Sequence, residues 1–293
     1  MGRTLFITTI LAGIGLSALA QFAPPTRPVP IQRAQQSSPF MRSRPTPAVI
    51  MDRNGVPDWE VDKDFPSDVF TFVRILYNPY GGGNGTWRVD WPDSDLNFSF
   101  RLQQLTALKV NPNPIILELT DERLFDYPFI YFVEPGGGGG GRGGGLNFSP
   151  EEATILRNYL LQGGFAMFDD FWGEGEWHVF AEAMRRVFPD REPQELPLDH
   201  PIFHIVYDLQ EKPQVPSIEY GRRGLSYERP DAQEVHYRAY FDDNGRIMAL
   251  ACHNTDLGDG WEREGEDETY FREYSEKRAY PMGINILFYA MTH

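Results

Sequence analysis

The sequence predicts an α/β domain with a mostly parallel sheet and helices on both of its faces. Three observations support this: strand-like segments alternate with amphipathic ones, one strand is a continuous apolar run, and one helix carries capping residues at both ends. Strands buried on both faces are typical of parallel sheets covered by helices. The chain has 293 residues, 41% of them hydrophobic, and can therefore bury the core of a sizeable domain.

The first half of the domain contains three predicted strands and one helix. Phe70–Tyr77 is rich in β-branched and aromatic residues and ends at an Asn-Pro pair, which favours a strand. Residues 97–109 carry apolar side chains at every third or fourth position, which favours a helix. Strands are predicted at Ile115–Leu119 and Phe129–Val133, and the second of these is the continuous apolar run.

The clearest helix signal begins at Ser149. Ser149 occupies the N-cap position, Pro150 the first helical position and Glu152 the third, which together form a capping box with proline in its preferred place. Gly163 and Gly164 end this helix, as a glycine C-cap does.

The second half is less regular. A strand is predicted at Phe165–Phe168 and a helix at residues 176–187, whereas residues 190–245 are rich in proline and charge and contain only short strand-like pieces. A last strand at 246–252 and a closing helix at 284–291 complete the pattern. We predict a single domain over residues 66–293.

The N-terminal residues predict export. Arg3 precedes an apolar run, Leu5–Leu19, and the small residues Ala18-Leu19-Ala20 mark a signal-peptide cleavage site after Ala20. The run is too short to span a bilayer, so we expect no stable membrane span after cleavage and a periplasmic or secreted protein. Residues 21–65 are rich in Pro, Gln and Arg and are predicted to form a disordered arm.

The charge distribution argues against nucleic acid and membrane partners. Residues 1–50 hold five of the 27 basic residues and none of the 42 acidic ones, so the rest carries 22 basic against 42 acidic side chains, a net charge of −20. Such a body repels nucleic acid and anionic lipid. Cys252 is the only cysteine, so no intrachain disulfide can form.

Five segments stand in order along the chain: RILYNPYGGGNGTWRVDWP, FDYPFIYFVEP, FSPEEATILRNYLLQGGFAMFDDFWG, FPDREPQELPLDHPIFHIVYDL and MGINILFYAM. Together they resemble domain-of-unknown-function family 4159, a bacterial group associated with the cell envelope. The resemblance implies a flavodoxin-like fold, similar to class I glutamine amidotransferases and to trehalose-utilisation proteins. It supplies no established activity.

The amidotransferase resemblance implies a cysteine nucleophile in the turn after the central strand, activated by a later histidine. Here that turn is Asp169-Asp170-Phe171-Trp172-Gly173, which contains no Cys, Ser or Thr. Cys252 lies inside the last predicted strand, where we expect it to be buried and inert. Thiol amidotransferase chemistry therefore lacks its nucleophile.

Asp169 and Asp170 allow two readings. One or both could face the crevice beyond the carboxyl ends of the strands and there hold a cation or act as a base. Alternatively, one caps the following turn or helix and the other meets water. Neighbouring strand residues point to opposite faces, so we expect one structural and one exposed carboxylate.

The crevice is predicted to include residues that follow the other strands. They are Gly81, Gly82, Gly83, Glu134, Asp170, His253 and Asn254, with Asp169, Asp170 and His253 as the candidate catalytic groups.

Two other motifs receive a structural interpretation. His200 and His204 have the spacing of a helical zinc pair, but Pro201 between them favours a loop held by hydrogen bonds of Asp199 and His200. The glycine-rich residues 136–145 lack a helix directly after them and are predicted to form a flexible surface loop. We therefore predict neither a metal nor a cofactor.

These observations favour an uncharacterised exported protein that acts as a non-catalytic ligand-binding or scaffolding domain of the cell envelope. Its predicted partner is an envelope protein or a small polar or sugar ligand. The alternative is a hydrolase or carbohydrate-processing enzyme that uses a carboxylate and histidine site, with or without a divalent metal.

Overall fold

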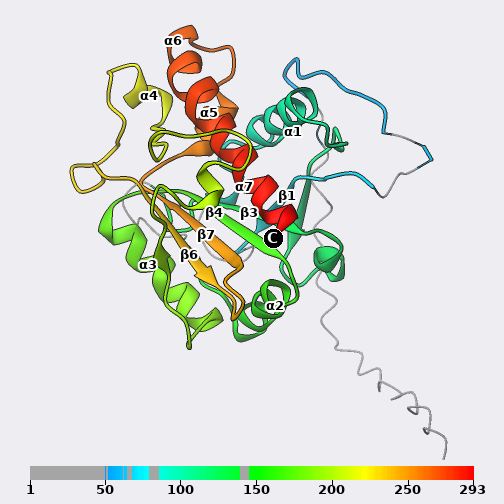
Figure 1. The fold of residues 1–293 in the computed structure, drawn as a ribbon, viewed down its shortest axis with the longest axis vertical. Coiled ribbons are helices and arrows are strands. Elements are labelled where there is room, and N and C mark those ends of the chain that lie inside the picture. The colour runs from blue at the N-terminus through cyan, green and yellow to red at the C-terminus, as the bar shows by residue number, and fades with distance from the viewer. Residues whose placement is uncertain (1–49, 51, 62, 65–67, 79–85, 139–144) are drawn as a thin grey trace, which may run out of the picture. The chain divides into compact units, whose positions relative to one another are not determined.

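The computed structural model describes residues 50, 52–61, 63–64, 68–78, 86–138 and 145–293. They belong to one compact unit, which extends over residues 46–293. Its centre is a seven-stranded sheet with the strand order β2-β1-β3-β4-β7-β6-β5 (Figure 1). The predicted signal peptide, residues 21–49 of the predicted arm, Gly81–Gly83 and residues 139–144 of the glycine-rich segment lie outside the described residues.

The sheet is mostly parallel, as predicted. β2, β1, β3, β4 and β7 run in one direction, and β6 and β5 form an antiparallel edge beside β7. The strands are β1 (Val73–Leu76), β2 (Ile115–Glu118), β3 (Phe129–Val133), β4 (Phe165–Phe171), β5 (Gln194–Glu195), β6 (His236–Phe241) and β7 (Ile247–His253).

Helices cover both faces of the sheet (Figure 1). The first face carries α1 (Asp93–Leu105), α5 (Leu257–Glu262) and α7 (Tyr280–Thr292), and the second carries α2 (Pro150–Leu161) and α3 (Gly173–Val187). The remaining helices are α4 (Ile218–Gly221), α6 (Glu268–Tyr270) and a π-helix over Phe271–Ala279. Short 3₁₀ turns occur at Thr86–Arg88, Glu122–Asp126 and Pro201–Phe203.

The apolar run in β3 is continuous because both faces of this strand are buried. Tyr131 belongs to the core cluster beneath α1, α5 and α7, whereas Ile130 and Phe132 belong to the cluster beneath α2 and α3. The Phe132 ring stacks on Phe168 of the neighbouring strand with ring centroids 4.5 Å apart. The alternation of side chains along each strand thus supplies two hydrophobic cores at once.

The capping prediction for α2 is confirmed. The Ser149 hydroxyl accepts a hydrogen bond from the Glu152 amide at 3.2 Å, and the Glu152 carboxylate accepts one from the Ser149 amide at 2.8 Å. Gly163 follows the helix with φ of 111°, a left-handed value that glycine adopts without a steric cost.

The strand predicted at 165–168 is longer than expected. β4 continues through both aspartates to Phe171, because Asp169 pairs with Val133 in the ladder and Phe171 pairs with His253. The following helix begins at Gly173, not near Glu176. The two aspartates therefore do not end this strand, and Asp169 accepts hydrogen bonds from residues distant in the chain, Tyr131 and Gly258.

Part of the segment assigned to the disordered arm contacts the domain. The Arg53 guanidinium donates a hydrogen bond to the Pro112 carbonyl at 3.0 Å, and the Trp59 indole donates one to the Val110 carbonyl at 2.7 Å. These contacts attach residues around 53–59 to the segment between α1 and β2, although the sequence analysis places them in the arm.

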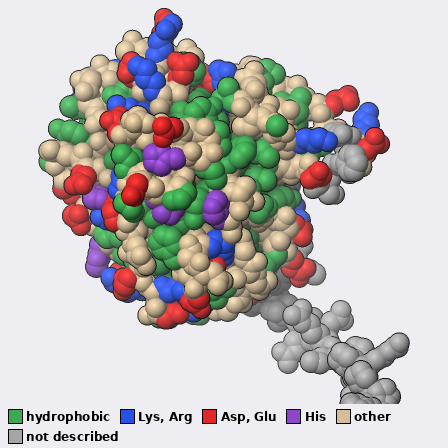
Figure 2. Space-filling view, in the orientation of Figure 1, with side chains coloured by type: hydrophobic (Ala, Val, Ile, Leu, Met, Phe, Trp, Pro, Cys, Tyr) green, Lys and Arg blue, Asp and Glu red, His purple; other side chains and the backbone are tan. Residues whose placement is uncertain are grey.

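Figure 2 shows the face on which α7 lies, where apolar side chains gather at the middle with charged side chains around them. In the part of the chain that the structure describes, none of the helices has the length and apolar character needed to cross a membrane.

Candidate functional site

A cavity of about 440 Å³ opens at the carboxyl ends of the parallel strands. β3 leads to Glu134, β4 to Asp170 and β7 to Asp256, while Asp90 comes from the connection between β1 and α1. The chain places β2 on one side of β1 and β3 on the other, and the crevice at such a reversal is where open α/β sheets bind ligands.

The described lining of this cavity is strongly acidic. Seven carboxylates line it, against two guanidinium groups from Arg229 and Arg263. The carboxylates belong to Asp90, Glu134, Asp170, Glu176, Glu228, Asp256 and Asp259. The aromatic residues Trp172 and Tyr220 and the hydroxyl-bearing Ser217 also line it. The cavity thus has five more acidic than basic groups, and this excess favours binding of a positively charged ligand.

Burial and mutual repulsion shift the protonation of these carboxylates. Burial, followed by the charges of Glu176 and Glu228, raises the pKa of Glu134 to about 7. Burial also raises the pKa of Asp170 well above its usual range, and the neighbouring Glu134 raises it further. Such groups hold protons near neutral pH until a cation replaces them.

Three lining residues other than glycine adopt left-handed backbone conformations. Asp90 has φ of 64°, Glu134 of 48° and Asp170 of 57°. Each such residue costs about 1–2 kcal/mol relative to an ordinary conformation. Asn78, after β1, and Asn254, after β7, share this conformation, so the carboxyl edge of the sheet concentrates backbone strain of the kind that clusters at ligand sites.

Asp169 lies behind the cavity, on the face covered by α1, α5 and α7. Its Oδ2 atom accepts hydrogen bonds from the Gly258 amide at 3.0 Å and from the Tyr131 hydroxyl at 3.1 Å. The side chain is fully buried, and burial raises its pKa to about 7. Asp169 therefore attaches the start of α5 to the centre of the sheet.

Asp170 lines the cavity itself. Its Oδ1 atom accepts a hydrogen bond from the Trp172 indole at 3.0 Å, and its amide donates one to the Thr255 carbonyl at 3.2 Å. The structure thus places the two adjacent aspartates differently, with Asp169 bonded to a helix start and Asp170 at the crevice. Both side chains are buried, so the expectation that one of them is exposed is wrong.

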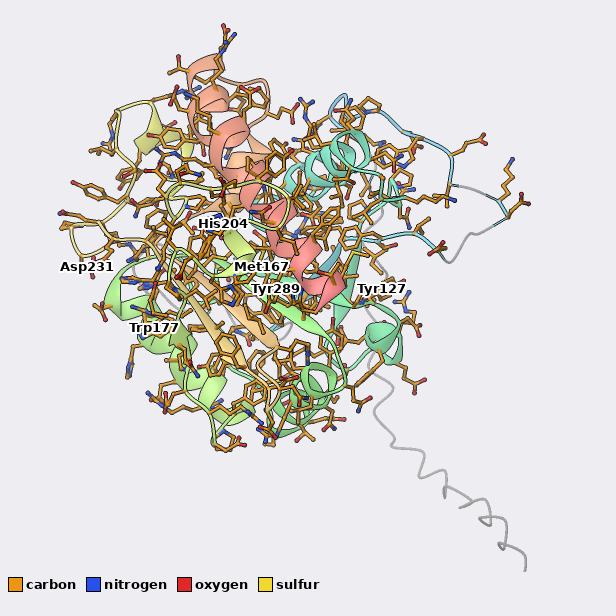
Figure 3. The ribbon with its side chains drawn as sticks, in the orientation of Figure 1. Tyr127, Met167, Trp177, His204, Asp231 and Tyr289 are labelled. Atoms are coloured by element: carbon orange, nitrogen blue, oxygen red, sulfur yellow. The ribbon has the colours of Figure 1, made fainter. Side chains whose placement is uncertain are left out.

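His253 does not meet either aspartate. It packs on the opposite face of the sheet from Asp169, against Phe171 and Trp177, with ring centroids 5.0 and 5.2 Å away. Its Nε2 atom lies 3.1 Å from the Gly173 carbonyl, and burial lowers its pKa to about 4. The imidazole is therefore neutral at pH 7 and forms part of the packing beneath α3, which supplies Trp177 (Figure 3).

Asn254 and Asp231 hold the turn between β4 and α3. The Gly173 amide donates a hydrogen bond to Asn254 Oδ1 at 2.8 Å, and the Glu174 amide donates one to Asp231 Oδ2 at 3.1 Å. Figure 3 shows Asp231 beside the start of α3. These amides thus bind Asn254 and Asp231, and neither Asp169 nor Asp170 caps the start of α3, which was one of the two readings of the pair.

The first residues of the glycine-rich segment contribute to the site. A Cβ atom at Gly136 would lie 2.3 Å from Glu176 Cβ, so only glycine permits this close approach to α3. Gly138 lines the cavity. The described ends of this segment therefore do not behave as the free surface loop that its composition predicts. Gly81–Gly83 lie outside the described residues.

The remaining candidates are engaged locally. His200 caps the 3₁₀ turn at Pro201–Phe203 by accepting a hydrogen bond from the Ile202 amide at 3.2 Å. The His204 ring lies 2.6 Å from an Asp208 carboxylate oxygen and 2.7 Å from the Leu198 carbonyl. Cys252 is buried inside β7, as predicted.

Sequence reasoning did not identify most of the cavity. The predicted ligand contacts did not include the lining residues Glu176, Glu228, Arg229 and Arg263. They also did not include Glu262, which lies near Asp90 and Asp259. Asp90 appeared only within a longer motif. A usable signal was present in DLGDGWERE, residues 256–264, where acidic residues and glycines directly follow the last parallel strand.

Comparison with known proteins agrees with the sequence resemblance. The family model described as Domain of unknown function (DUF4159) matches residues 71–291, which include the whole parallel sheet and the described lining of the cavity. No curated protein matches the chain.

Proposed function

Because the chain belongs to the DUF4159 family of domains of unknown function, its role has to be argued from its own residues, and we propose that it is a non-catalytic ligand-binding domain exported to the cell envelope. Its ligand is a small hydroxylated molecule that carries a positive charge, such as an amino sugar. Seven carboxylates and two guanidinium groups around one cavity are the observation that carries this proposal.

Charge favours a cationic ligand over a neutral one. An ammonium group about 4 Å from a carboxylate gains about 4 kcal/mol at the effective dielectric of a protein surface. Several carboxylates can share one such group here, and Trp172 and Tyr220 offer rings for contact with a sugar ring or a cation. A neutral polar ligand would leave the repulsion between the buried carboxylates uncompensated.

Binding is favoured over catalysis by the composition of the site. Within the described lining there is no Cys, His or Lys, and His253 lies beneath α3 outside the cavity. Asp170 occupies a strained, irregular position near the end of the central strand β4, in the segment where the amidotransferase resemblance implies a cysteine. The order of the five parallel strands, β2-β1-β3-β4-β7, supports the flavodoxin-like fold that this resemblance implies.

Calorimetric titration with glucosamine and N-acetylglucosamine in buffer containing EDTA tests the proposal, since these sugars differ in the charge of one nitrogen. We expect glucosamine to bind at least about tenfold more tightly, which corresponds to about 1.4 kcal/mol. Glu134→Gln should weaken glucosamine binding, and Glu276→Gln, at an exposed glutamate outside the cavity, should not. Equal affinity for both sugars, or no binding of either, would contradict the proposal.

A further inference from the structure

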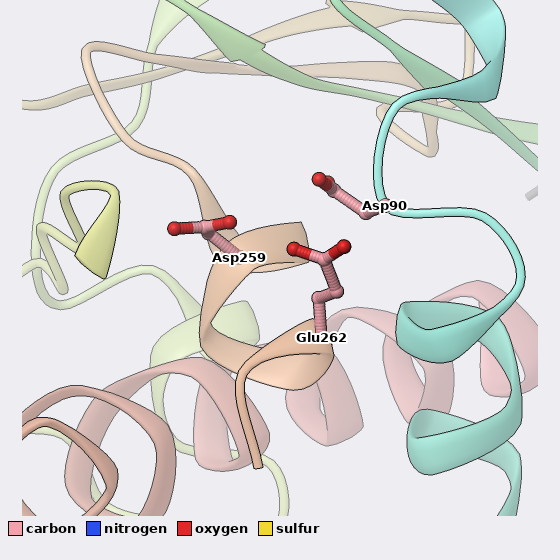
Figure 4. A group of neighbouring side chains, drawn as sticks. All are labelled: Asp90, Asp259 and Glu262. Carbon is pink, nitrogen blue, oxygen red and sulfur yellow. The ribbon is translucent and has the colours of Figure 1, made fainter. Parts of the chain in front are cut away.

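Three carboxylates converge at the end of the cavity that α5 lines. Asp259 and Glu262 lie three residues apart on α5, and Asp90 faces them from the segment before α1 (Figure 4). One oxygen atom from each lies within 4.8 Å of the others. Two residues of one helix face and one from a separate loop therefore form a compact oxygen cluster.

An independent observation points to a ligand at this cluster. Asp90 is 93% buried, at 7% exposure, and its Oδ2 atom has no hydrogen-bond partner in the described part of the chain. A buried polar atom without a partner costs about 1–3 kcal/mol, and more when it is charged. Since Asp90 lines the cavity, a ligand that binds this oxygen can reach it from there.

The nearby cations do not satisfy Asp90. All donors of Arg74 are directed elsewhere, with its Nε and Nη2 atoms on Asp95 and Ser94 and its Nη1 atom on the carbonyls of Trp87 and Val89. Arg263 contacts Glu262 at 2.6 Å and Asp259 at 3.4 Å and offsets only part of the cluster's charge.

We propose that Asp90, Asp259 and Glu262 bind a hard divalent cation such as Ca²⁺. Carboxylate oxygens are the ligands that Ca²⁺ prefers, at 2.3–2.6 Å, and oxygens up to 4.8 Å apart can share such an ion. The sequence predicted no metal site, because Asp90 lies far along the chain from Asp259 and Glu262. The proposal deepens the proposed function: three protein ligands leave coordination positions that water or a hydroxyl of the bound ligand fills.

The test is equilibrium dialysis of the full chain, stripped with EDTA, against Ca²⁺, Mg²⁺ and Mn²⁺ in turn. We expect about one bound Ca²⁺ per chain and a rise in melting temperature with Ca²⁺ concentration. Asp90→Asn and Glu262→Gln should each weaken Ca²⁺ binding at least about tenfold. Glu276→Gln is the surface control, because it removes an exposed carboxylate outside the cavity. It should bind Ca²⁺ within about threefold of the parent chain.

Asp90→Asn and Glu262→Gln change the cluster at two separate positions. A cooperative thermal melt establishes that each variant is folded. No uptake of any of the three ions at millimolar concentration would overturn the inference, as would unchanged Ca²⁺ affinity in either folded variant. The glucosamine titration contains EDTA and tests the proposed function separately. Glucosamine binding without ion uptake would refute only the ion site, and ion uptake without glucosamine binding would refute only the proposed ligand.

Discussion

Asp169 and His253 lie on neighbouring central strands but on opposite faces of the sheet. Asp169 contacts Tyr131 and the start of α5, whereas His253 stacks on Phe171 beneath α3. A carboxylate and an imidazole separated by the sheet cannot form a proton-transfer pair. Burial disfavours the charged form of each group, so it raises the pKa of Asp169 to about 7 and lowers that of His253 to about 4.

We expect the free energy of unfolding of the parent protein to fall between pH 4 and pH 7, and we expect Asp169→Asn to reduce that fall. The folded state holds the Asp169 proton up to about pH 7, while the unfolded chain releases it near pH 4. Stability from this group is therefore complete below pH 4 and lost as pH rises through 7, by at most about 4 kcal/mol. The Asn variant stays neutral throughout, and urea unfolding at pH 5, 6, 7 and 8 measures the difference.

The control for this prediction is Asp126→Asn, which removes an exposed carboxylate. Its profile should follow that of the parent protein. The prediction fails if Asp169→Asn retains the full slope of unfolding free energy against pH.

The elements that the sequence predicts well are those with local causes. The capping box of Ser149 and Glu152 needs residues only three positions apart, and the apolar run of β3 follows from burial on both faces. β4 was predicted too short because the Asp169 Oδ2 atom accepts hydrogen bonds from Tyr131 and Gly258, which are 38 and 89 residues away. Such partners leave no periodic signal near the aspartates.

The site was predicted only in part for the same reason. Glu134 and Asp170 could be placed at the crevice because each follows a recognisable strand. Asp90, Glu228 and Asp259 come from irregular segments or short helices, and only the fold brings them together. His253 and Asn254 follow a correctly predicted strand, but their side chains bind the turn before α3 instead of lining the cavity.

Gly136→Ala should destabilise the protein by about 1–3 kcal/mol, because the new Cβ would lie 2.3 Å from Glu176 Cβ and force α3 to shift. Gly175→Ala is the matched control. It adds the same methyl group to α3, where nothing lies within 4 Å, and alanine favours a helix over glycine by up to about 1 kcal/mol. Urea unfolding measures both. Equal effects of the two changes would show that the contact at Gly136 does not constrain the segment.

Arg74→Lys should destabilise the protein by about 1–3 kcal/mol, since lysine keeps the charge beside the fully buried Asp95 but leaves carbonyls of the segment before α1 without donors. Lysine cannot reproduce the five directed N–H groups of arginine. Arg123→Lys is the control, because the Arg123–Asp121 pair is largely exposed and such pairs contribute at most about 1 kcal/mol. Chemical denaturation compares the two, and similar losses would contradict the structural role of Arg74.

Export is tested by the N-terminus of the mature protein. After expression in a bacterium that exports it, we expect N-terminal sequencing to begin at Gln21, because Ala18-Leu19-Ala20 supplies the small residues of a cleavage site. Ala20→Arg should block processing and leave the longer chain. Recovery of the parent chain with an intact Met1 in a membrane fraction would refute cleavage.

Asp170→Asn should lower ligand affinity without lowering stability. Asparagine tolerates the left-handed conformation at this position, and its amide oxygen can still accept the hydrogen bond from Trp172. The change also removes a buried carboxyl group whose ionisation Glu134 and Asp90 oppose, so we expect an equal or higher melting temperature and at least about tenfold weaker glucosamine binding. Asp170→Ala should also weaken glucosamine binding. It should in addition lower the free energy of unfolding by about 1–2 kcal/mol, because alanine disfavours the left-handed conformation. Thermal melts and calorimetry separate the two effects, and Asn binding as tightly as Asp would exclude Asp170 from the ligand site.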